Sequence, residues 1–464
     1  MTFCCKLELP RHPHSLPLAR ALVEQLSSLA GLPDSELAQA CQEAVENALH
    51  YAPGEVLLEA ELSELDLVLC VVDQGAPMEG APQTSKGHGL ERIARAVDEL
   101  RWVSLGRQGK ELLLRRRRPH PEVGQLESLE RFPDEPPLAP EQDYQVRPFQ
   151  PQDALGVARL CYQVYGYTYM HEELYFPDRL TAMNASGQLY SMVALDAAGQ
   201  VVGHYALERP QPGPLAECGE ALVSPMHRGR KLMERMGQQL ETVAPDLGLT
   251  TLYSNAVTLH PYSQRAAEGF GRTPCGLTLS GVPAQVTFKG LGGGQRTSCV
   301  LYVQYLSRPP ARPVYLPDRY RELLLQLYDR LGDQVSPQDA SALAGEGALT
   351  VELKPCFQTG RIRVTRPGED SPTALAQALR DLCQLGQAQA VYLELPLDDP
   401  ATPELTLRAR ELGFFFSALG PQDWLRLQWV AQPVDMGALK LNSDQTRALR
   451  DFIQADRSAG PETE

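Results

Sequence analysis

Two proline clusters divide this chain of 464 residues into separate stretches. Residues 119–142 hold six prolines among several glutamates, and Pro309, Pro310 and Pro313 form a second break. Because proline fixes φ and has no backbone donor, such segments do not continue a helix or a sheet and stay extended. We therefore expect folded units at 1–118, 143–308 and 314–455, with 119–142 as a linker, which agrees with about 150 residues per domain.

Composition narrows the class of protein. The apolar fraction of 43% is enough for buried cores, and the net charge of −15 argues against nucleic-acid or anionic-membrane binding. The arginine run 115–118 precedes an acidic segment, so we interpret it as a solvated strand end, with a docking patch for an acidic partner as the alternative.

Cysteine usage and hydropathy indicate a cytoplasmic location. The ten cysteines include no CxxC pair, which fits reduced thiols rather than disulfides or a metal site. The N-terminus lacks the pattern of a secretory signal, and no apolar run approaches the roughly 20 residues of a membrane-spanning helix. We expect no contact with a membrane.

Hydrophobic periodicity predicts a mixed α/β (α+β) fold throughout. In the first unit the pattern predicts strands at 2–9, 55–63, 65–72, 99–105 and 110–117, and helices at 15–30, about 35–51 and 89–97. In the second it predicts strands at 144–149, 189–195, 201–208, 216–223, 250–256 and 299–306, and helices at 152–165, 229–242 and 262–269. In the third it predicts strands at 349–353, 361–365 and 390–395, and helices at 371–385 and 403–412.

Three motifs in the first unit suggest a nucleotide pocket. Glu43 and Asn47 lie one helical turn apart and share a face. Asp73 ends an apolar strand, where a buried acid needs a partner such as an amino group of adenine, and Gly75 permits close backbone approach. Gly87 and Gly89 open a helix, whose N-terminus suits phosphate.

The order and spacing of these motifs resemble the GHKL ATPase superfamily, and most closely the anti-sigma-factor serine kinases of bacterial partner switching. The resemblance implies ATP with Mg²⁺ as cofactor. It implies Asn47 as the Mg²⁺ ligand, Glu43 as the base for a target serine, and Asp73 as the adenine reader, with Gly75, Gly87 and Gly89 forming the nucleotide loops. A pocket that binds nucleotide without transferring phosphate is the alternative.

A second motif lies in the middle unit. Val223 ends a predicted strand, and Arg228, Gly229, Arg230 and Lys231 then lead into a helix, whose free amides suit pyrophosphate. The segment resembles the acetyl-CoA motif of GNAT acyltransferases. It departs from the family pattern at Lys231 and Met233, where small residues are expected; the lysine would either neutralise pyrophosphate or crowd it.

Catalytic candidates accompany this motif. Glu217 and Glu220 lie on the strand that often supplies the general base in the GNAT family, and we expect at most one to face the cleft; we select Glu220. Tyr262 is a candidate acid for the thiolate, with a packing role as the alternative. Gly269-Phe270 resembles the end of the GNAT helix that packs beside the cofactor.

Residues 314–455 resemble a degenerate GNAT domain without a phosphate turn; an unrelated α/β domain is the alternative. Together the resemblances imply a bacterial regulator that joins a kinase-like ATP module to an N-acetyltransferase acting on an amine or a protein lysine. Its partner would be an antagonist protein with a target serine or a sigma-like factor, and a homodimer is possible. The alternative is a non-catalytic sensor of ATP and acyl-CoA that sequesters a partner.

Overall fold

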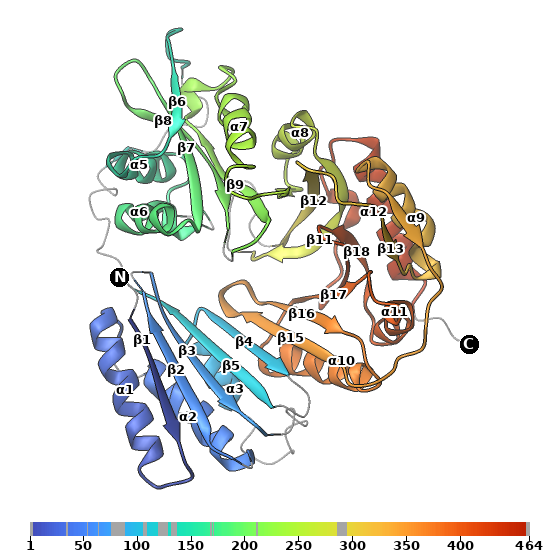
Figure 1. The fold of residues 1–464 in the computed structure, drawn as a ribbon. Coiled ribbons are helices and arrows are strands. Elements are labelled where there is room, and N and C mark those ends of the chain that lie inside the picture. Colours follow the sequence, from blue (N-terminus) through green and yellow to red (C-terminus); the bar gives the residue numbers. More distant parts are fainter. Residues whose placement is uncertain are drawn as a thin grey trace.

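The fold was analysed in a computed structural model, which describes residues 3–460 except 34–35, 53, 64, 76–88, 105–108, 119–128, 131–136, 168, 170, 210–211 and 285–294. The mixed α/β class expected from the sequence is confirmed. Within the described residues, seventeen strands join into one sheet that curves through the whole molecule (Figure 1).

The N-terminal unit is an antiparallel sheet with helices packed on one face. Alternate residues of its central strand, from Leu67 to Asp73, are buried, so Asp73 points toward the helical layer. The strands pair in the order β1-β2-β3-β5-β4. The elements are β1 (Phe3–Leu9), α1 (Ser15–Ala30), α2 (Glu36–Tyr51), β2 (Val56–Leu62), β3 (Asp66–Asp73), α3 (Gly89–Arg95), β4 (Glu99–Ser104) and β5 (Lys110–Arg117), and all eight were predicted.

The middle unit continues the same sheet in the order β6-β7-β8-β9-β10-β12-β11, and only the β9–β10 pair is parallel among these described strands. The sequence did not predict α6 or β11. The elements are β6 (Gln145–Pro148), α5 (Ala154–Tyr165), α6 (Pro177–Ser186), β7 (Leu189–Leu195), β8 (Val201–Glu208), β9 (Leu215–Val223), α7 (Leu232–Val243), β10 (Thr251–Val257), α8 (Tyr262–Gly269), β11 (Thr273–Val282) and β12 (Thr297–Tyr305).

The C-terminal unit pairs its strands in the order β15-β16-β17-β19-β18. The flanking helices α9 and α12 were not predicted. The elements are β13 (Arg312–Val314), α9 (Asp318–Arg330), β14 (Val335–Pro337), β15 (Ala348–Lys354), β16 (Thr359–Arg366), α10 (Ser371–Arg380), β17 (Ala390–Pro396), α11 (Thr402–Glu411), β18 (Phe415–Gly420), β19 (Trp424–Val430) and α12 (Asp444–Ser458).

The pairing pattern of the middle unit recurs in the C-terminal unit. An antiparallel pair (β8–β9) is followed by a parallel pair (β9–β10) and two antiparallel pairs (β10–β12, β12–β11). The series β15–β16, β16–β17, β17–β19 and β19–β18 has the same directions. The two series meet where β11 pairs with β18, at Gly276 and Ala418.

The N-terminal unit joins the C-terminal unit edge to edge. Strand β4 pairs with β15 from Leu100 opposite Leu353 to Ser104 opposite Leu349. Units that are separate in the sequence therefore share one sheet, and the arc returns the N-terminal unit to the neighbourhood of α6 (Figure 1).

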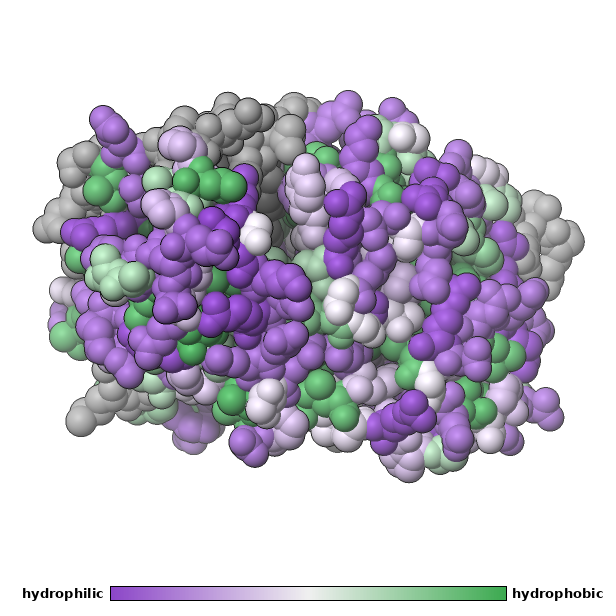
Figure 2. All heavy atoms as spheres, turned by 90° about the horizontal axis from the view of Figure 1, so that it is seen from above, coloured by the Kyte–Doolittle hydropathy of each residue, from purple (hydrophilic) through white to green (hydrophobic). Residues whose placement is uncertain are grey.

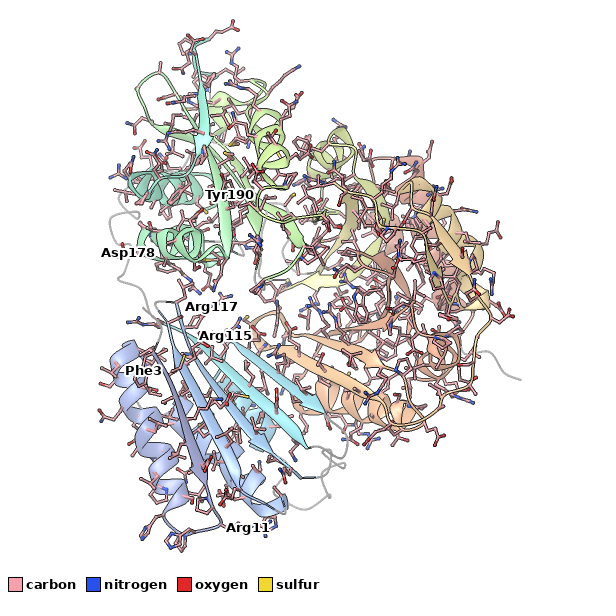
Figure 3. The ribbon with its side chains drawn as sticks, viewed as in Figure 1. Phe3, Arg11, Arg115, Arg117, Asp178 and Tyr190 are labelled. Atoms are coloured by element: carbon pink, nitrogen blue, oxygen red, sulfur yellow. The ribbon has the colours of Figure 1, made fainter. Side chains whose placement is uncertain are left out.

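The arginine run ends β5, as expected, but its side chains are half-buried and paired rather than fully solvated. Arg115 pairs with Glu99 at 3.1 Å, and Arg116 pairs with Asp98 at 3.4 Å. Arg118 donates to the carbonyls of Ala30 and Ser63. Arg115 and Arg117 lie at the end of the N-terminal sheet nearest to the middle unit (Figure 3).

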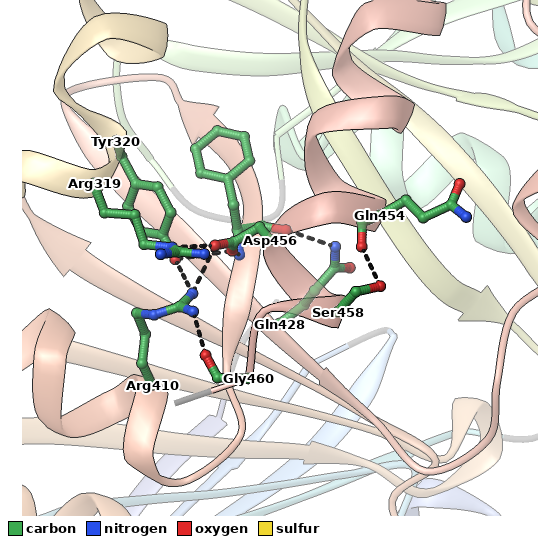
Figure 4. A network of polar contacts seen from close by, with 9 residues as sticks. Arg319, Tyr320, Arg410, Gln428, Gln454, Asp456, Ser458 and Gly460 are labelled. Carbon is green, nitrogen blue, oxygen red and sulfur yellow. Dashed lines mark hydrogen bonds and ion pairs between the residues drawn. The ribbon is translucent and has the colours of Figure 1, made fainter. Parts of the chain in front are cut away.

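A buried ionic network ties α9, α11 and α12 together in the C-terminal unit (Figure 4). Asp456 accepts hydrogen bonds from Arg410 at 2.7 Å and from Tyr320 at 3.0 Å. It also pairs with Arg319 at 2.5 Å and accepts from the backbone N–H of Phe416 at 2.7 Å. One carboxylate thus fixes two helices that the sequence analysis missed.

None of the described helices has the length and hydropathy needed to cross a membrane. The face seen in Figure 2 is predominantly hydrophilic, with hydrophobic residues scattered in small groups.

Candidate functional site

The middle unit opens between its two parallel strands. β9 and β10 pair at three positions, the last of which places Glu217 opposite Tyr253, and pair no further along their described lengths. Asn255, two residues on, donates from its side chain to Glu217 Oε1 at 2.9 Å. Beyond Glu217 the backbone of β9 is therefore not paired with β10 in the described structure.

Glu220 forms a bulge on the strand that borders this opening. Its φ of 57° lies in the left-handed region, and the pairing of β8 with β9 shifts register beside it, between His204 and Ala206. Bulges re-aim side chains next to active sites. Here the bulge lies at Glu220 itself, whose side chain is buried.

His204, a buried histidine on β8, holds the bulge through a hydrogen bond to its backbone. His204 Nδ1 lies 2.9 Å from the carbonyl oxygen of Glu220, and its Nε2 lies 3.0 Å from Ser191 Oγ. Burial lowers the pKa of His204 to about 4, so the ring is neutral. Nδ1–H therefore donates to the Glu220 carbonyl, and Nε2 accepts from the serine hydroxyl.

The Glu220 side chain is completely buried, and neither carboxyl oxygen has a hydrogen-bond partner among the described residues. Oε1 lies 3.6 Å from His171 Nδ1, which also lies 3.3 Å from Glu173 Oε1. Burial raises the pKa of Glu220 well above its ordinary value; the nearby His171 opposes this shift, and the charges of Glu173 and Glu208 add to it.

His171 and Glu173 form an ion pair beside Glu220. Burial would lower the pKa of His171, but its hydrogen bond to Glu173 and the surrounding carboxylates raise it to about 10. Burial would raise the pKa of Glu173, but His171 and Arg117 lower it to about 2. The pair is charged at neutral pH. Glu173 therefore has a hydrogen-bond donor in His171, whereas Glu220 has none among the described residues.

The turn after β9 has the left-handed geometry expected for an anion site, but the helix that follows it begins later than predicted. Gly229 (φ 75°) and Lys231 (φ 54°) are left-handed, and a Cβ on Gly229 would meet nothing within 4 Å. Helix α7 begins at Leu232, three residues later than predicted, because Lys231 serves as its N-cap. Val223 ends β9, and Arg228 is exposed.

Arg230 lies toward the segment before β6. Its Nη2 donates to the carbonyl of Ala139 at 3.2 Å, and its Nη1 lies 4.0 Å from Glu141. The backbone N–H of Ala139 donates in turn to Met226 at 2.8 Å. In this arrangement residues 139–141 border the turn, and Arg230 is engaged with them.

Tyr262 is the first residue of helix α8, and 69% of the residue is exposed. The ring of Phe270, just after α8, fills the space above Gly237 of α7. Phe270 therefore packs against α7. The role of Tyr262 stays a prediction.

The N-terminal unit brings three of its candidates together. A Cβ on Gly89 would lie 3.5 Å from Asn47 Nδ2 and 3.8 Å from Glu43 Oε2. Glu43 pairs with Arg92 at 2.8 Å, and its Oε2 is buried without a hydrogen-bond partner in the described structure.

Asp73, at the end of β3, already has partners. Its Oδ1 accepts from the backbone N–H of Gly75 at 2.7 Å and lies 3.8 Å from Lys110 Nζ. Burial raises the pKa of Asp73, whereas Lys110 and the Gly75 hydrogen bond lower it. Gly87 lies outside the described residues, so its part in a nucleotide loop stays a prediction.

Sequence reasoning missed His171, Glu173, His204 and Glu208. His204 carried a usable signal, because it is the polar residue inside the apolar run 201–207. His171 and Glu173 lie outside any regular helix or strand that the pattern predicted. Only the fold brings them to Glu220.

Residues 157–271 match the acetyltransferase (GNAT) family, so the middle unit contains a GNAT acetyltransferase domain. No curated protein sequence matches the chain.

Several solved structures are similar to about a third of the chain. A Salmonella typhimurium protein described as an acetyltransferase, solved with its cofactor acetyl-CoA, is 15% identical (36% of this chain, 96% of that chain, TM-score 0.30). An N-acetyltransferase from Staphylococcus aureus Mu50 is 15% identical (36% and 99%, TM-score 0.30). The ribosomal-protein-S5-alanine acetyltransferase from Vibrio fischeri is 13% identical (35% and 93%, TM-score 0.29).

Proposed function

We propose that the middle unit transfers an acetyl group from acetyl-CoA to an amine, with Glu220 as the general base. The observation that carries this proposal is the orphaned carboxyl of Glu220, held on a bulge where β9 and β10 separate. The family match to acetyltransferases and a similar structure solved with acetyl-CoA support it.

The residues present suit this cofactor. The left-handed turn at Gly229 and Lys231 leaves room for a pyrophosphate, and the first amides of α7 are free of partners within the helix. Arg228 is exposed and adds positive charge. Arg230 would have to leave Ala139 to do the same. Acetyl-CoA supplies the acetyl group as an activated thioester.

Glu220 is suited to take a proton from the substrate ammonium. A general base works best when its pKa lies near the operating pH, and burial shifts Glu220 in that direction. His204 fixes the backbone at the bulge, and the charged His171–Glu173 pair borders the carboxyl. Tyr262 is proposed as the acid for the leaving thiolate; its exposed ring would first have to turn toward the opening.

Calorimetric titration with acetyl-CoA tests cofactor binding. Gly229→Val should weaken binding because a β-branched residue disfavours φ near 75° and would reshape the turn. Gly199→Val, in another left-handed turn with open surroundings, is the matched control and should bind as wild type. Equal binding by wild type and Gly229→Val would show that the phosphates of acetyl-CoA bind at a different place.

A second candidate function is ATP binding by the N-terminal unit. The observation that favours it is the convergence of Glu43, Asn47 and Gly89, with the buried Asp73 on the same side of the sheet. Asn47 would hold Mg²⁺, whose charge would neutralise the phosphates. Asp73 would have to share its carboxylate between Gly75 and adenine.

Serine phosphorylation of a protein partner, by Glu43 as base, extends this second candidate. Glu43 would first have to release Arg92. Transfer of radiolabel from ATP to a candidate antagonist protein would distinguish a kinase from a nucleotide sensor. A partner protein, a homodimer and a regulatory link between the units are part of the same proposal.

A further inference from the structure

Three metal-binding side chains converge where the acetyltransferase unit opens. His171 precedes a short 3₁₀ turn, Glu208 ends β8, and Glu220 lies on the bulge of β9. One donor atom from each lies within 4.8 Å of the other two. In the described part of the chain, this is the one cluster of three or more His, Cys, Asp or Glu side chains close enough together to hold an ion.

The burial of Glu220 is a second observation that suits a cation at this place. Its side chain has no exposed surface, and both oxygens lack hydrogen-bond partners among the described residues. Burying a carboxyl without a partner is unfavourable unless a cation or a hydrogen-bond donor satisfies it. His171 cannot do so fully, because its Nδ1 is closer to Glu173.

The spacing is close to that of a metal site. Two donors about 2.1 Å from a tetrahedral zinc lie about 3.4 Å apart. His171 Nδ1 and Glu220 Oε1 are 3.6 Å apart, so these two atoms already have this spacing. To ligate the ion, His171 must release the Nδ1 proton that it shares with Glu173, so metal binding frees a proton. Glu208 lies at the end of β8 and is partly exposed, so its side chain can turn to close the remaining gap.

The donor set also selects the ion. One imidazole with two carboxylates suits zinc, cobalt(II), manganese or iron(II). Magnesium and calcium prefer oxygen ligands alone. A zinc-like divalent ion with a water as its fourth ligand fits these three residues.

We propose that His171, Glu208 and Glu220 bind a divalent transition-metal ion, and that the bound ion blocks acetyl transfer. The first part stands on the three side chains themselves. The second part rests on the proposed function, because a carboxylate that ligates metal cannot also accept a proton from the substrate amine.

Cobalt(II) titration of the metal-free full-length protein tests the first part without any substrate. Tetrahedral cobalt gives visible absorption bands, and thiolate ligation adds a sulfur-to-metal charge-transfer band, so binding at any of the ten cysteines is recognised. We expect one equivalent to bind with nitrogen and oxygen ligands only, and zinc to displace it.

Glu208→Gln should weaken cobalt binding by about 100-fold or more, since loss of an outer-shell partner alone costs 10–100-fold. Glu217→Gln is the matched control, because Glu217 pairs directly opposite Glu208 on β9 but is absent from the cluster. Circular dichroism of both variants confirms that they fold, and His171→Gln provides a second ligand variant.

The outcomes separate the two parts. Binding that is lost in Glu208→Gln and His171→Gln but kept in Glu217→Gln supports the site. No binding at millimolar cobalt, a thiolate band, or equal affinity in all four proteins overturns it. If the ion binds but leaves amine acetylation unchanged, the site stands and its inhibitory role is refuted; if no acetylation occurs even without metal, the proposed function fails separately.

Discussion

Gly237 of α7 lies directly beneath the ring of Phe270: a Cβ on Gly237 would approach Phe270 Cζ to 2.2 Å. This contact sets the distance between α7 and the end of α8. Because the N-terminus of α7 forms the proposed phosphate turn, the glycine links packing in the core to cofactor binding.

Gly237→Ala should therefore destabilise the middle unit and weaken acetyl-CoA binding. An added methyl group in a filled core typically costs about 1–3 kcal/mol, since α7 or the Phe270 ring must move. Gly213→Ala is the control, because nothing lies within 4 Å of its Cβ position. Thermal denaturation with and without acetyl-CoA measures both effects, and identical melting curves for the two variants would contradict this packing.

Glu220→Gln should lower kcat by about 10²–10⁴-fold while acetyl-CoA binding is retained, because a base is removed but the phosphate turn is not. The base acts in its deprotonated form, and burial raises its pKa. In the wild type, kcat/KM should therefore rise with pH. The midpoint of this rise should lie above the pKa of an ordinary glutamate. A flat profile in wild type, or an unchanged limb in Glu220→Gln, would assign the proton transfer to another group.

Asp456→Ala should destabilise the C-terminal unit by about 3–5 kcal/mol, the usual cost of removing one partner from a buried ion pair. The side chain of Arg410, 3% exposed, would be left without its carboxylate. Asp451→Ala, on the same helix with a 63% exposed side chain, should stay within about 0.5 kcal/mol of wild type. Urea denaturation compares the two; equal midpoints would refute a stabilising role for the network.

Asn47→Ala should abolish Mg²⁺-dependent ATP binding and leave acetyl-CoA binding intact, because the two sites lie in different units. Glu46→Ala changes an exposed neighbour on α2 and is the control. Fluorescence titration with a labelled ATP analogue measures the difference. Equal affinity of the two variants would remove Asn47 from the nucleotide site.

Local patterns predicted most of the elements because apolar periodicity is a local property. All eight elements of the N-terminal unit were expected, and β7, β8 and α8 were expected with their observed bounds. Helices α9 and α12 were missed, although both carry their buried residues on one face. Strand β11 was missed because its apolar residues are interrupted by Pro274, Gly276 and Gly281.

The site was predictable only in part. Glu220 could be selected from its strand, but its left-handed bulge and its neighbours depend on contacts across the fold. His171 reaches Glu220 from a distant part of the chain, and nothing in the local pattern indicates that contact. Likewise, the pairing of β4 with β15 joins two units that the proline segments separate in the sequence.

Thiol release from acetyl-CoA in the presence of a panel of primary amines tests the central claim most directly, with mass spectrometry of the amine products. The account predicts release that depends on the amine, matches the acetylated product in amount, and falls in Glu220→Gln but not in Glu217→Gln. Thiol release that is absent with every amine tested, or that proceeds equally in Glu220→Gln, would contradict it.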